Sequence, residues 1–144
     1  MPSTFAGAVI PAGADTVWRV LRNFGALADW QPAVTSSTLR DGDVPGLVGS
    51  ARTLTSAEGG TVVESLVALD DVARSLTYEM TGDVFPVYDY RATIQVWPVT
   101  STDEAFVGWS ADFACDPAAE QHLIALFRDT IFTGGLNALA KYLA

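Results

Sequence analysis

Apolar and polar residues follow two different periods along this chain, and the change of period separates helical from extended segments. Residues 4–10 are apolar and β-prone, and a proline ends the run. Within residues 14–21, Val17, Trp18 and Leu21 recur at helical spacing, which predicts an amphipathic helix. The N-terminal part is therefore predicted to form a strand and then a helix.

A second short helix is predicted directly after the first one. Phe24, Leu27 and Trp30 continue the apolar pattern at intervals of three, and Pro32 closes it. From residue 34 onward the period falls to two, and turn-like Asp-Gly and Gly-Gly pairs separate the runs. This spacing predicts a meander of six antiparallel strands. The predicted strands cover residues 34–40, 49–55, 61–69, 75–81, 88–99 and 105–116.

The last part of the chain predicts one long helix. Pro117 opens it, with Asp116 as the N-cap. A broad apolar stripe continues to Leu143, so a helix of about 25 residues would extend ~38 Å. It must lie against the sheet, because no other element remains to cover its apolar face. The pair Gly134-Gly135 in its middle lowers helix stability and indicates a kink or a close approach to another element.

These elements predict an α+β fold in a single domain that covers residues 1–144. The predicted sheet has seven antiparallel strands and curves around the long C-terminal helix, and two short helices follow its first strand. A strongly curved sheet that grips a helix tends to leave a cavity between the two. A binding site inside the protein is therefore expected.

Composition supports a folded domain and excludes several classes of partner. Hydrophobic residues make up 49% of the 144-residue chain, which is enough to bury a core. The net charge of −9 argues against nucleic acid as a partner, because phosphate backbones bind clusters of Lys and Arg. The same charge disfavours a stable association with anionic membranes, and no apolar run is long enough to span a bilayer.

The cysteine and histidine content limits the possible chemistry. Cys115 is the only cysteine, so no intrachain disulfide can form, which fits a reducing compartment. Because no N-terminal secretory signal is present either, we predict a cytoplasmic protein. His122 is the only histidine, and we interpret it as a surface or helix-packing residue. No metal spacing, phosphate loop or nucleophilic triad occurs, so we expect neither a metal nor a cofactor.

The strongest candidate for function is a pair of opposite charges on an apolar strand face. Arg52 and Glu64 lie symmetrically about the predicted Glu58-Gly59-Gly60 turn, so antiparallel pairing places them side by side. Period-two alternation puts Arg52 with Leu54, and Glu64 with Val62, on the same inner face. A charge on such a face is costly unless it is paired or needed. The pair is either a structural ion pair or part of a functional site.

Alternation along the last three strands gives an inner face that is aromatic and apolar. Besides Arg52 and Glu64, its polar groups are the hydroxyls of Tyr78 and Tyr90. Apolar walls with a few orienting polar groups are typical of a small-molecule pocket. The inner residues of these strands are Leu76, Tyr78, Met80, Tyr90, Ala92, Ile94, Val96, Val107, Trp109, Ala111 and Phe113.

Several short motifs occur in an order that resembles a known superfamily. They are Asp15-Thr-Val-Trp18, Asn23-Phe24-Gly25, Trp30-Gln-Pro32, Gly49-Ser-Ala-Arg-Thr-Leu54, Glu64-Ser-Leu66, Leu69-Asp-Asp71, Leu76-Thr-Tyr78, Tyr90-Arg-Ala-Thr-Ile-Gln-Val96, Trp109-Ser-Ala-Asp-Phe113 and Gly134-Gly-Leu136 with Leu139. The ordered set resembles the START-like or SRPBCC superfamily, and it looks closest to the bacterial polyketide cyclase/dehydrase and lipid transport proteins. The resemblance implies the helix-grip fold, whereas it implies function only loosely.

The resemblance and the strand alternation agree on the residues that would line a cavity. By resemblance, Glu64 and Tyr90 fall where related hormone receptors place polar ligand contacts, and Tyr78 falls on their aromatic wall. Phe85 lies in a loop that would cover the cavity mouth, near the Glu58-Gly59-Gly60 turn. The predicted ligand-binding residues are Trp30, Arg52, Leu54, Val62, Glu64, Leu66, Tyr78, Phe85, Tyr90, Ala92, Trp109, Phe127, Ile131 and Gly135.

Three functions fit this sequence. The first is a soluble carrier or sensor that binds a hydrophobic or aromatic small molecule. The second is an enzyme of the polyketide cyclase or dehydratase type, in which Glu64 or Tyr90, with Arg52 nearby, moves a proton. The third is an interaction protein without a ligand, whose exposed Trp97 and Phe106 mark a partner surface. We expect a monomer or a homodimer.

Overall fold

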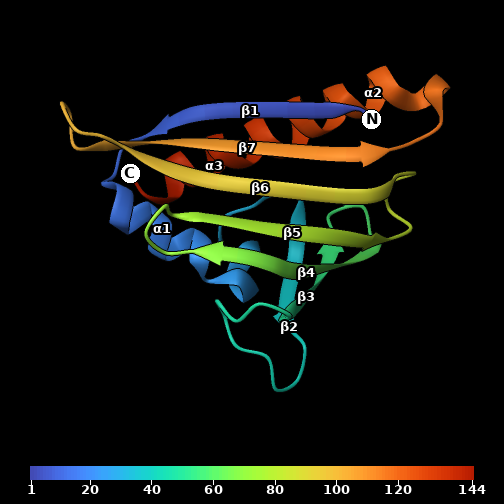
Figure 1. Cartoon of the computed structure of the whole chain (residues 1–144), viewed down its shortest axis with the longest axis horizontal. Helices are drawn as coiled ribbons and strands as arrows, with labels where there is room; N and C mark the ends of the chain where they lie inside the picture. The colour runs from blue at the N-terminus through green and yellow to red at the C-terminus, as the bar shows by residue number, and fades with distance from the viewer.

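A single antiparallel sheet of seven strands forms the framework of the protein. A computed structural model describes all residues, Met1–Ala144. The strands lie in the order β1-β7-β6-β5-β4-β3-β2, so the first two strands of the chain form opposite edges of the sheet (Figure 1). Their bounds are Ser3–Ile10 for β1, Val34–Leu39 for β2, Ala51–Ser56 for β3, Thr61–Asp70 for β4, Ser75–Gly82 for β5, Tyr88–Val99 for β6 and Glu104–Ala114 for β7.

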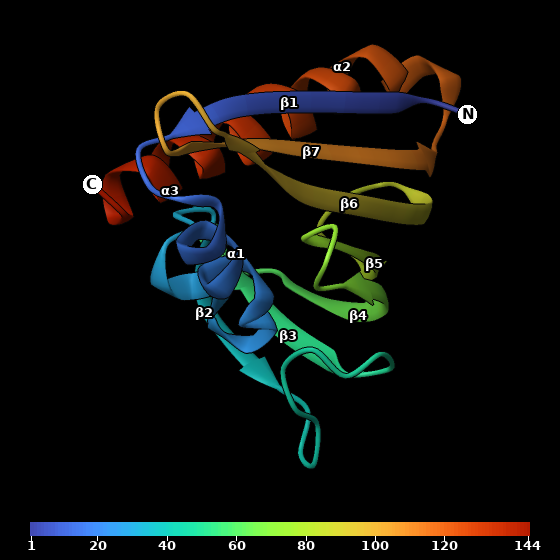
Figure 2. The same ribbon diagram turned by 60° about the vertical axis from the view of Figure 1, so that its left-hand side comes forward.

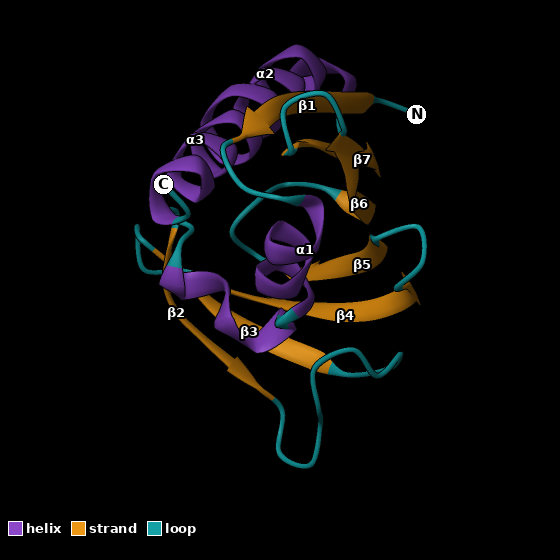
Figure 3. Cartoon of the chain, turned by 90° about the vertical axis from the view of Figure 1, so that its left-hand side faces the viewer, coloured by secondary structure: helices purple, strands orange, loops and turns teal.

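Helices cover the concave side of the sheet. The helix α1 (Ala14–Arg22) and the 3₁₀ helix η1 (Phe24–Asp29) join the two edge strands, as predicted. The sheet curves from β1 and β7, beside the C-terminal helix, round to β3 and β2 below α1 (Figures 2 and 3). The C-terminal helix consists of η2 (Pro117–Ala119), α2 (Glu120–Ala125), the π-helical segment η3 (Leu126–Thr133) and α3 (Gly134–Tyr142). The predicted α+β architecture is confirmed.

Burial on the strands follows the predicted alternation. Tyr90 and Trp109 are both 3% exposed, whereas Arg91 and Asp112 between the inner positions are exposed. The C-terminal helix closes this face through aromatic packing, because the Trp109 ring stacks on Phe132 with 4.6 Å between centroids. The buried inner residues of β6 and β7 are Tyr90, Ala92, Ile94, Val96, Val107, Trp109, Ala111 and Phe113.

The C-terminal helix departs from the single regular helix that the sequence predicts. Asp116 caps its start, because its Oδ1 accepts a hydrogen bond from the Ala118 amide at 3.0 Å. The backbone then passes from 3₁₀ to α, to π and back to α within residues 117–142. The apolar stripe identifies the buried face of the helix, but it carries no signal for this change in hydrogen bonding. Such π segments occur frequently at functional sites.

The glycine pair in this helix corresponds to a close approach. Gly134 has helical dihedral angles, with φ of −59° and ψ of −43°. A Cβ atom on Gly135 would overlap the side-chain nitrogen of Gln31 and would lie 3.1 Å from the Trp109 ring. A Cβ atom on Gly134 would meet only the Asp129 carbonyl, at 3.9 Å. Of the two glycines, Gly135 is the one that allows the helix to pack closely.

The start of β3 and the end of β7 each lie two residues inside the predicted bounds. β3 starts at Ala51, two residues late, because Gly49 has a positive φ of 97° that does not continue a strand. β7 ends at Ala114, because Asp116 already serves as the N-cap of the following helix. Both differences come from local turn and cap geometry at the end of a strand.

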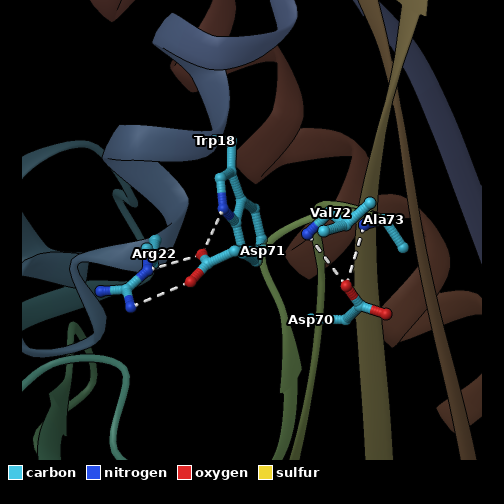
Figure 4. A network of polar contacts seen from close by, with 6 residues as sticks. All are labelled: Trp18, Arg22, Asp70, Asp71, Val72 and Ala73. Carbon is cyan, nitrogen blue, oxygen red and sulfur yellow. Dashed lines mark hydrogen bonds and ion pairs between the residues drawn. The ribbon is translucent and has the colours of Figure 1, made fainter.

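A cluster of polar contacts ties α1 to the turn between β4 and β5 (Figure 4). Asp71 Oδ1 accepts a hydrogen bond from Trp18 Nε1 at 2.9 Å and another from Arg22 Nε at 2.7 Å. Asp70 stabilises the turn itself, because its Oδ1 accepts two backbone amides that follow it in sequence. We call Trp18, Arg22 and Asp71 the α1 clasp. It fixes α1 on the concave side, where the helix buries Val17 and Leu21.

Candidate functional site

A cavity of about 290 Å³ remains between the sheet and the C-terminal helix. This volume lies at the lower end of the range of ligand pockets, ~300–1,000 Å³. The sheet contributes residues of five neighbouring strands. They are Leu54, Val62, Glu64, Tyr78, Met80, Tyr90 and Trp109.

The opposite side of the cavity comes from helices and loops. The π-helical segment η3 contributes Leu126, Phe127, Thr130 and Ile131, so half of its residues line the cavity. The remaining lining residues come from η1 and its link to β2, from the start of β2, from the end of β3 and from two loops. They are Leu27, Gln31, Ala33, Val34, Ser56, Ala57, Glu58, Val84 and Phe85.

The two loops meet beside the cavity, as the sequence predicts. Glu58 lies in the β3–β4 turn and Phe85 in the β5–β6 loop. A Cβ atom on Gly60 would lie 2.5 Å from Val84 Cγ2, so Gly60 allows the loops to touch. The Phe85 ring packs on Phe127 of the C-terminal helix, with 4.9 Å between centroids. Phe85 therefore connects the sheet side and the helix side of the cavity.

Arg52 and Glu64 form the predicted ion pair. The two residues are directly opposite in the β3–β4 register, and their side chains are 5% and 7% exposed. Arg52 Nε and NH2 contact the same carboxylate oxygen, Glu64 Oε1, at 2.9 and 2.7 Å. Arg52 NH1 donates to the Phe24 carbonyl at 2.9 Å, and the guanidinium lies 3.9 Å from the centroid of the Phe24 ring. These contacts fix the Arg52 side chain next to Glu64, and of the two residues only Glu64 lines the cavity.

Burial sets the electrostatics of this pair. The pKa of Glu64 is raised from its ordinary value of 4.5, mainly because burial disfavours the charged carboxylate. The charge and the hydrogen bonds of Arg52 oppose this rise. The pKa of Glu64 is therefore raised because the effect of losing water on burial is larger than the opposing effect of the ion pair with Arg52. A carboxyl group with a raised pKa inside a cavity is typical of a functional site, although structural pairs also occur.

Two tyrosines complete the polar part of the cavity wall. Tyr78 accepts a hydrogen bond from Trp109 Nε1 at 3.1 Å. Burial raises the pKa of Tyr78 above its ordinary range, with a further contribution from the Glu64 charge. The pKa of Tyr90 is also raised, first by burial and then by Tyr78 and Glu64. Both hydroxyls thus stay protonated and are able to donate hydrogen bonds.

Most of the residues that the sequence proposes as ligand contacts lie on the cavity. Their roles in binding stay a prediction. Strand alternation identified the sheet residues, and helical spacing identified Phe127 and Ile131. The nine that line the cavity are Leu54, Val62, Glu64, Tyr78, Phe85, Tyr90, Trp109, Phe127 and Ile131.

Five proposed contacts lie elsewhere. Trp30 and Arg52 border a separate void of about 10 Å³, which is room for at most one water molecule. Leu66 and Ala92 are buried in the core, with exposed fractions of 1% and 0%. Gly135 packs under Gln31 instead of forming the cavity floor. Alternation identifies the inner face of the sheet, but it does not tell which part of that face α1 and η1 cover.

Gln31 is the main cavity residue that the sequence analysis missed. It is 2% exposed, its Nε2 donates to the Ile131 carbonyl at 3.1 Å, and its Oε1 accepts from the Ala33 amide at 3.3 Å. It thus joins the segment between η1 and β2 to the π-helical segment. The only sequence signal for its role was a polar residue between Trp30 and Pro32, at the end of the predicted second helix. Met80 and Thr130 were also missed, although the alternation placed Met80 on the inner face.

The convex face of the sheet carries the aromatic patch that the sequence assigns to a partner. The rings of Trp97 and Phe106 lie 5.8 Å apart, and Trp97 is 42% exposed. Phe5 of β1 extends the patch across Gly108, where a Cβ atom would lie 3.0 Å from the Phe5 ring. Nothing in the structure shows what covers this patch. The interaction hypothesis therefore gains no support from it.

The single histidine, the metal-binding residue types and the helices are the other features that bear on function. His122 is exposed on α2, in agreement with a surface role. No group of three or more His, Cys, Asp or Glu side chains is placed to hold a metal ion. None of the helices combines the length and the apolar character that crossing a membrane requires.

Comparison with known proteins agrees with the fold. A family model described as polyketide cyclase/dehydrase and lipid transport matches residues 3–144. The protein XoxI from Bacillus cereus is 32% identical, with a TM-score of 0.88, over 99% of this chain and 96% of that chain. A protein from Thermobifida fusca is 34% identical, with a TM-score of 0.88, over 99% of this chain and 93% of that chain. No curated protein sequence matches the chain.

Similarity in fold extends to a plant enzyme. A point mutant of norcoclaurine synthase from Thalictrum flavum, in complex with a transition-state analogue, has a TM-score of 0.74. It is 20% identical over 98% of this chain and 92% of that chain, and at this identity the likeness shows the fold alone. The predicted superfamily and the predicted helix-grip fold are both confirmed.

Proposed function

We propose that this chain, which belongs to the polyketide cyclase/dehydrase and lipid transport family, binds a small hydrophobic or aromatic molecule in its internal cavity. The cavity itself carries this proposal, because the neighbouring part of the concave face is closely packed while this part stays open. Apolar walls with a few convergent polar groups are the usual makeup of a ligand site. The aromatic side chains that line it are Tyr78, Phe85, Tyr90, Trp109 and Phe127.

Each group has a role in this proposal. Phe85 and Phe127 form an aromatic wall against which the rings of the ligand pack, because both line the cavity and their own rings lie 4.9 Å apart. Tyr90 and Glu64 orient its polar atoms. Arg52 positions Glu64, because two of its nitrogens contact Oε1 and it does not itself line the cavity.

Native mass spectrometry of freshly purified protein is the first test. We expect a co-purified small molecule that gentle extraction releases. Its mass would identify the ligand class directly. A ligand-free mass would leave occupancy to be decided by the dye titration that follows.

A dye titration tests the site itself. The neutral fluorophore 6-propionyl-2-(dimethylamino)naphthalene should bind with a blue shift in emission, because the cavity excludes water. Thr130→Trp places a large ring at an exposed lining position, and we expect it to weaken dye binding at least about tenfold. Asp129→Trp is the matched control, because Asp129 is exposed on the same segment and does not line the cavity. Equal weakening in both variants, or no binding to the wild type, would contradict the proposal.

Three features of Glu64 support the cyclase-type function as a second candidate. Glu64 lines the cavity, the contacts of Arg52 use only its Oε1, and burial raises its pKa. Such a carboxyl is suited to take up and return a proton. In that role, Oε2 would remove a proton from the carbon between two ketone groups of a ligand. The enolate formed would then take a proton back from the same carboxyl.

Proton exchange tests this second function separately from binding. Benzoylacetone in D₂O should exchange the hydrogens between its two carbonyls faster with the protein than in buffer, as followed by NMR. Glu64→Gln should abolish the acceleration, whereas Glu58→Gln, which removes the other lining carboxylate, should keep it. Exchange at the buffer rate in the wild type, with the dye still bound, would leave binding as the function and reject proton transfer.

A further inference from the structure

The geometry points to a cavity that selects ligands carrying a hydrogen-bond donor, an amine or a hydroxyl, and that rejects carboxylates, phosphates and other anions. This inference rests on the proposed binding function and names the class of ligand for the same site. It follows from three features: the free oxygen of Glu64, the position of Arg52 and the charges on the cavity wall.

The first feature is an unused acceptor. Both contacts from Arg52 end on Glu64 Oε1, and no protein donor contacts Oε2. Every side-chain oxygen or nitrogen that is fully enclosed has a hydrogen-bond partner, so Oε2 must border open space. Glu64 lines the cavity and is only 6% exposed, so that space is the cavity. A ligand N–H or O–H placed there would give a charge-assisted hydrogen bond.

The second feature is the absence of a cation from the wall. Arg52 would be the natural partner of a ligand carboxylate, but it does not line the cavity. Its Nε and NH2 contact Glu64, and its NH1 donates to the Phe24 carbonyl. Its guanidinium lies 3.9 Å from the centroid of the Phe24 ring and 5.1 Å from that of the Tyr78 ring. Releasing it to a ligand would leave Glu64 buried and unpaired, which is strongly unfavourable.

The third feature is the sign of the charges that do face the cavity. Glu58 and Glu64 are the only ionisable acids or bases of the wall other than tyrosine, so an entering anion meets only negative charges. The Tyr90 hydroxyl is able to donate to a ligand oxygen, which favours a neutral carbonyl or hydroxyl there. A full negative charge would have to lose its water without a cation to replace it. The aromatic walls act in the same direction, because ring faces attract positive groups.

A series of naphthalenes that differ only in the head group tests the inference. The probes are 2-naphthol, 2-naphthylmethylamine, 2-methoxynaphthalene and 2-naphthoate, titrated at pH 7 by calorimetry. The first two donate a hydrogen bond, the third only accepts, and the fourth is an anion. We expect 2-naphthol or the amine to bind roughly 10–100-fold more tightly than the methoxy compound, which is typical of a hydrogen bond to a charged group. The carboxylate should bind most weakly.

Two variants locate the selectivity. Glu64→Gln removes the charge and frees Arg52, so we expect the preference for donors to disappear and naphthoate binding to improve. Glu58→Gln removes the other lining charge, so naphthoate binding should improve while the preference for donors over the methoxy compound stays. The ranking in the wild type tests the inference even if Glu64→Gln fails to fold.

Each outcome bears on a different conclusion. Equal affinity for all four probes, or tightest binding of naphthoate, would overturn the inference and leave the binding function standing. A donor preference that Glu64→Gln keeps would also overturn it, because the preference would then come from another group. Binding of none of the probes, together with no dye binding, would overturn the proposed function and the inference with it. The ranking of the amine against naphthol distinguishes a cationic ligand from a neutral one.

Discussion

The protein uses arginine–carboxylate pairs in two regions that differ mainly in their access to water. At the cavity, Arg52 and Glu64 approach to 2.7 Å with side chains that are 5% and 7% exposed. In the α1 clasp, Arg22 and Asp71 approach to the same 2.7 Å with side chains that are 38% and 53% exposed. The contact distances are equal, but the pairs differ in burial and in their hydrogen bonds, since Asp71 also accepts from Trp18. The contact distance alone therefore does not tell whether an ion pair in this protein stabilises the charged form of its carboxylate.

The two carboxyl groups respond to their surroundings in opposite directions. The pKa of Asp71 is lowered, first by the hydrogen bond from Arg22 and then by the one from Trp18. The pKa of Glu64 is raised, because burial outweighs Arg52. The α1 clasp thus stabilises the charged form of a carboxylate that is exposed to water. Burial beside the cavity destabilises the charged form of Glu64. This difference is why the proposed function assigns the ligand contact to Glu64 and not to Asp71.

Removal of the buried arginine should have the largest effect. Arg52→Met leaves Glu64 uncompensated inside the protein, and we expect the free energy of unfolding to fall by about 3–5 kcal/mol at neutral pH. Urea unfolding followed by circular dichroism measures this loss. The double variant Arg52→Met/Glu64→Leu should recover most of it, because an apolar pair of similar volume replaces both charges. A loss no greater than that of Arg22→Met would break the comparison between the two regions.

The neighbouring glycines should respond in opposite directions and show how tightly the cavity region is packed. Gly135→Ala places a Cβ atom on Gln31, so we expect a loss of about 1–3 kcal/mol and a displaced Gln31 side chain. Gly134→Ala has free space and a helical backbone, so it should stabilise the protein by about 0.4–1 kcal/mol. Thermal unfolding of both variants gives the comparison. An increase in stability in Gly135→Ala would show that the Gln31 side chain moves aside at little cost in free energy.

The pH dependence of stability should show the two pairs in separate windows. The folded pKa of Glu64 lies above 4.5, so its effect on stability is most favourable below that pH and declines as pH rises through the folded pKa. The folded pKa of Asp71 lies below 3.8, so its contribution is present above that pH and is lost as pH falls through the folded pKa. For a buried group such as Glu64, a tenfold change in the acid dissociation constant on folding corresponds to about 1.36 kcal/mol of stability.

Unfolding titrations of Glu64→Gln and Asp71→Asn against the wild type measure these windows. The difference curve for Glu64→Gln should slope above pH 4.5, and the curve for Asp71→Asn should slope below pH 3.8. Slopes in the same window would mean that burial does not control Glu64.

The clasp variants should have the smallest effect at neutral pH. Asp71→Asn and Arg22→Met remove an exposed pair, which competes with water and is screened by salt. We expect a small decrease in Tm that disappears at about 1 M salt, with dye binding unchanged. The decrease in Arg52→Met should persist in the same salt. A large salt-independent loss in Asp71→Asn would indicate that the hydrogen bond from Trp18 holds α1 in place.

The fold was predictable because its signals are periodic. Strand alternation on β6 and β7, the spacing of Val17, Trp18 and Leu21, and the Asp116 cap are all local, and each is confirmed in the structure. The ion pair was predictable for the same reason, since two charges placed symmetrically about a turn must meet in a hairpin. The cytoplasmic location and the oligomeric state stay predictions.

The cavity was predictable only in part. Alternation put Leu66, Ala92 and Tyr90 on one face, yet only Tyr90 reaches the cavity, because Leu66 and Ala92 are packed in the core. Gln31 could not be placed from the sequence, because its partner Ile131 lies 100 residues away. The π-helical segment could not be predicted either, because the spacing of apolar residues does not change there.

The sequence by itself determined which side chains face inward and which two charges must pair, because both follow from short-range periodicity along a strand. Only the tertiary structure decided which oxygen of Glu64 is free, that Arg52 is turned away from the cavity, and where the concave face stays open. Those features depend on contacts between distant segments, such as Phe24 with Arg52 and Phe85 with Phe127. The inferred ligand class belongs to this second group, because it depends on where the charges point.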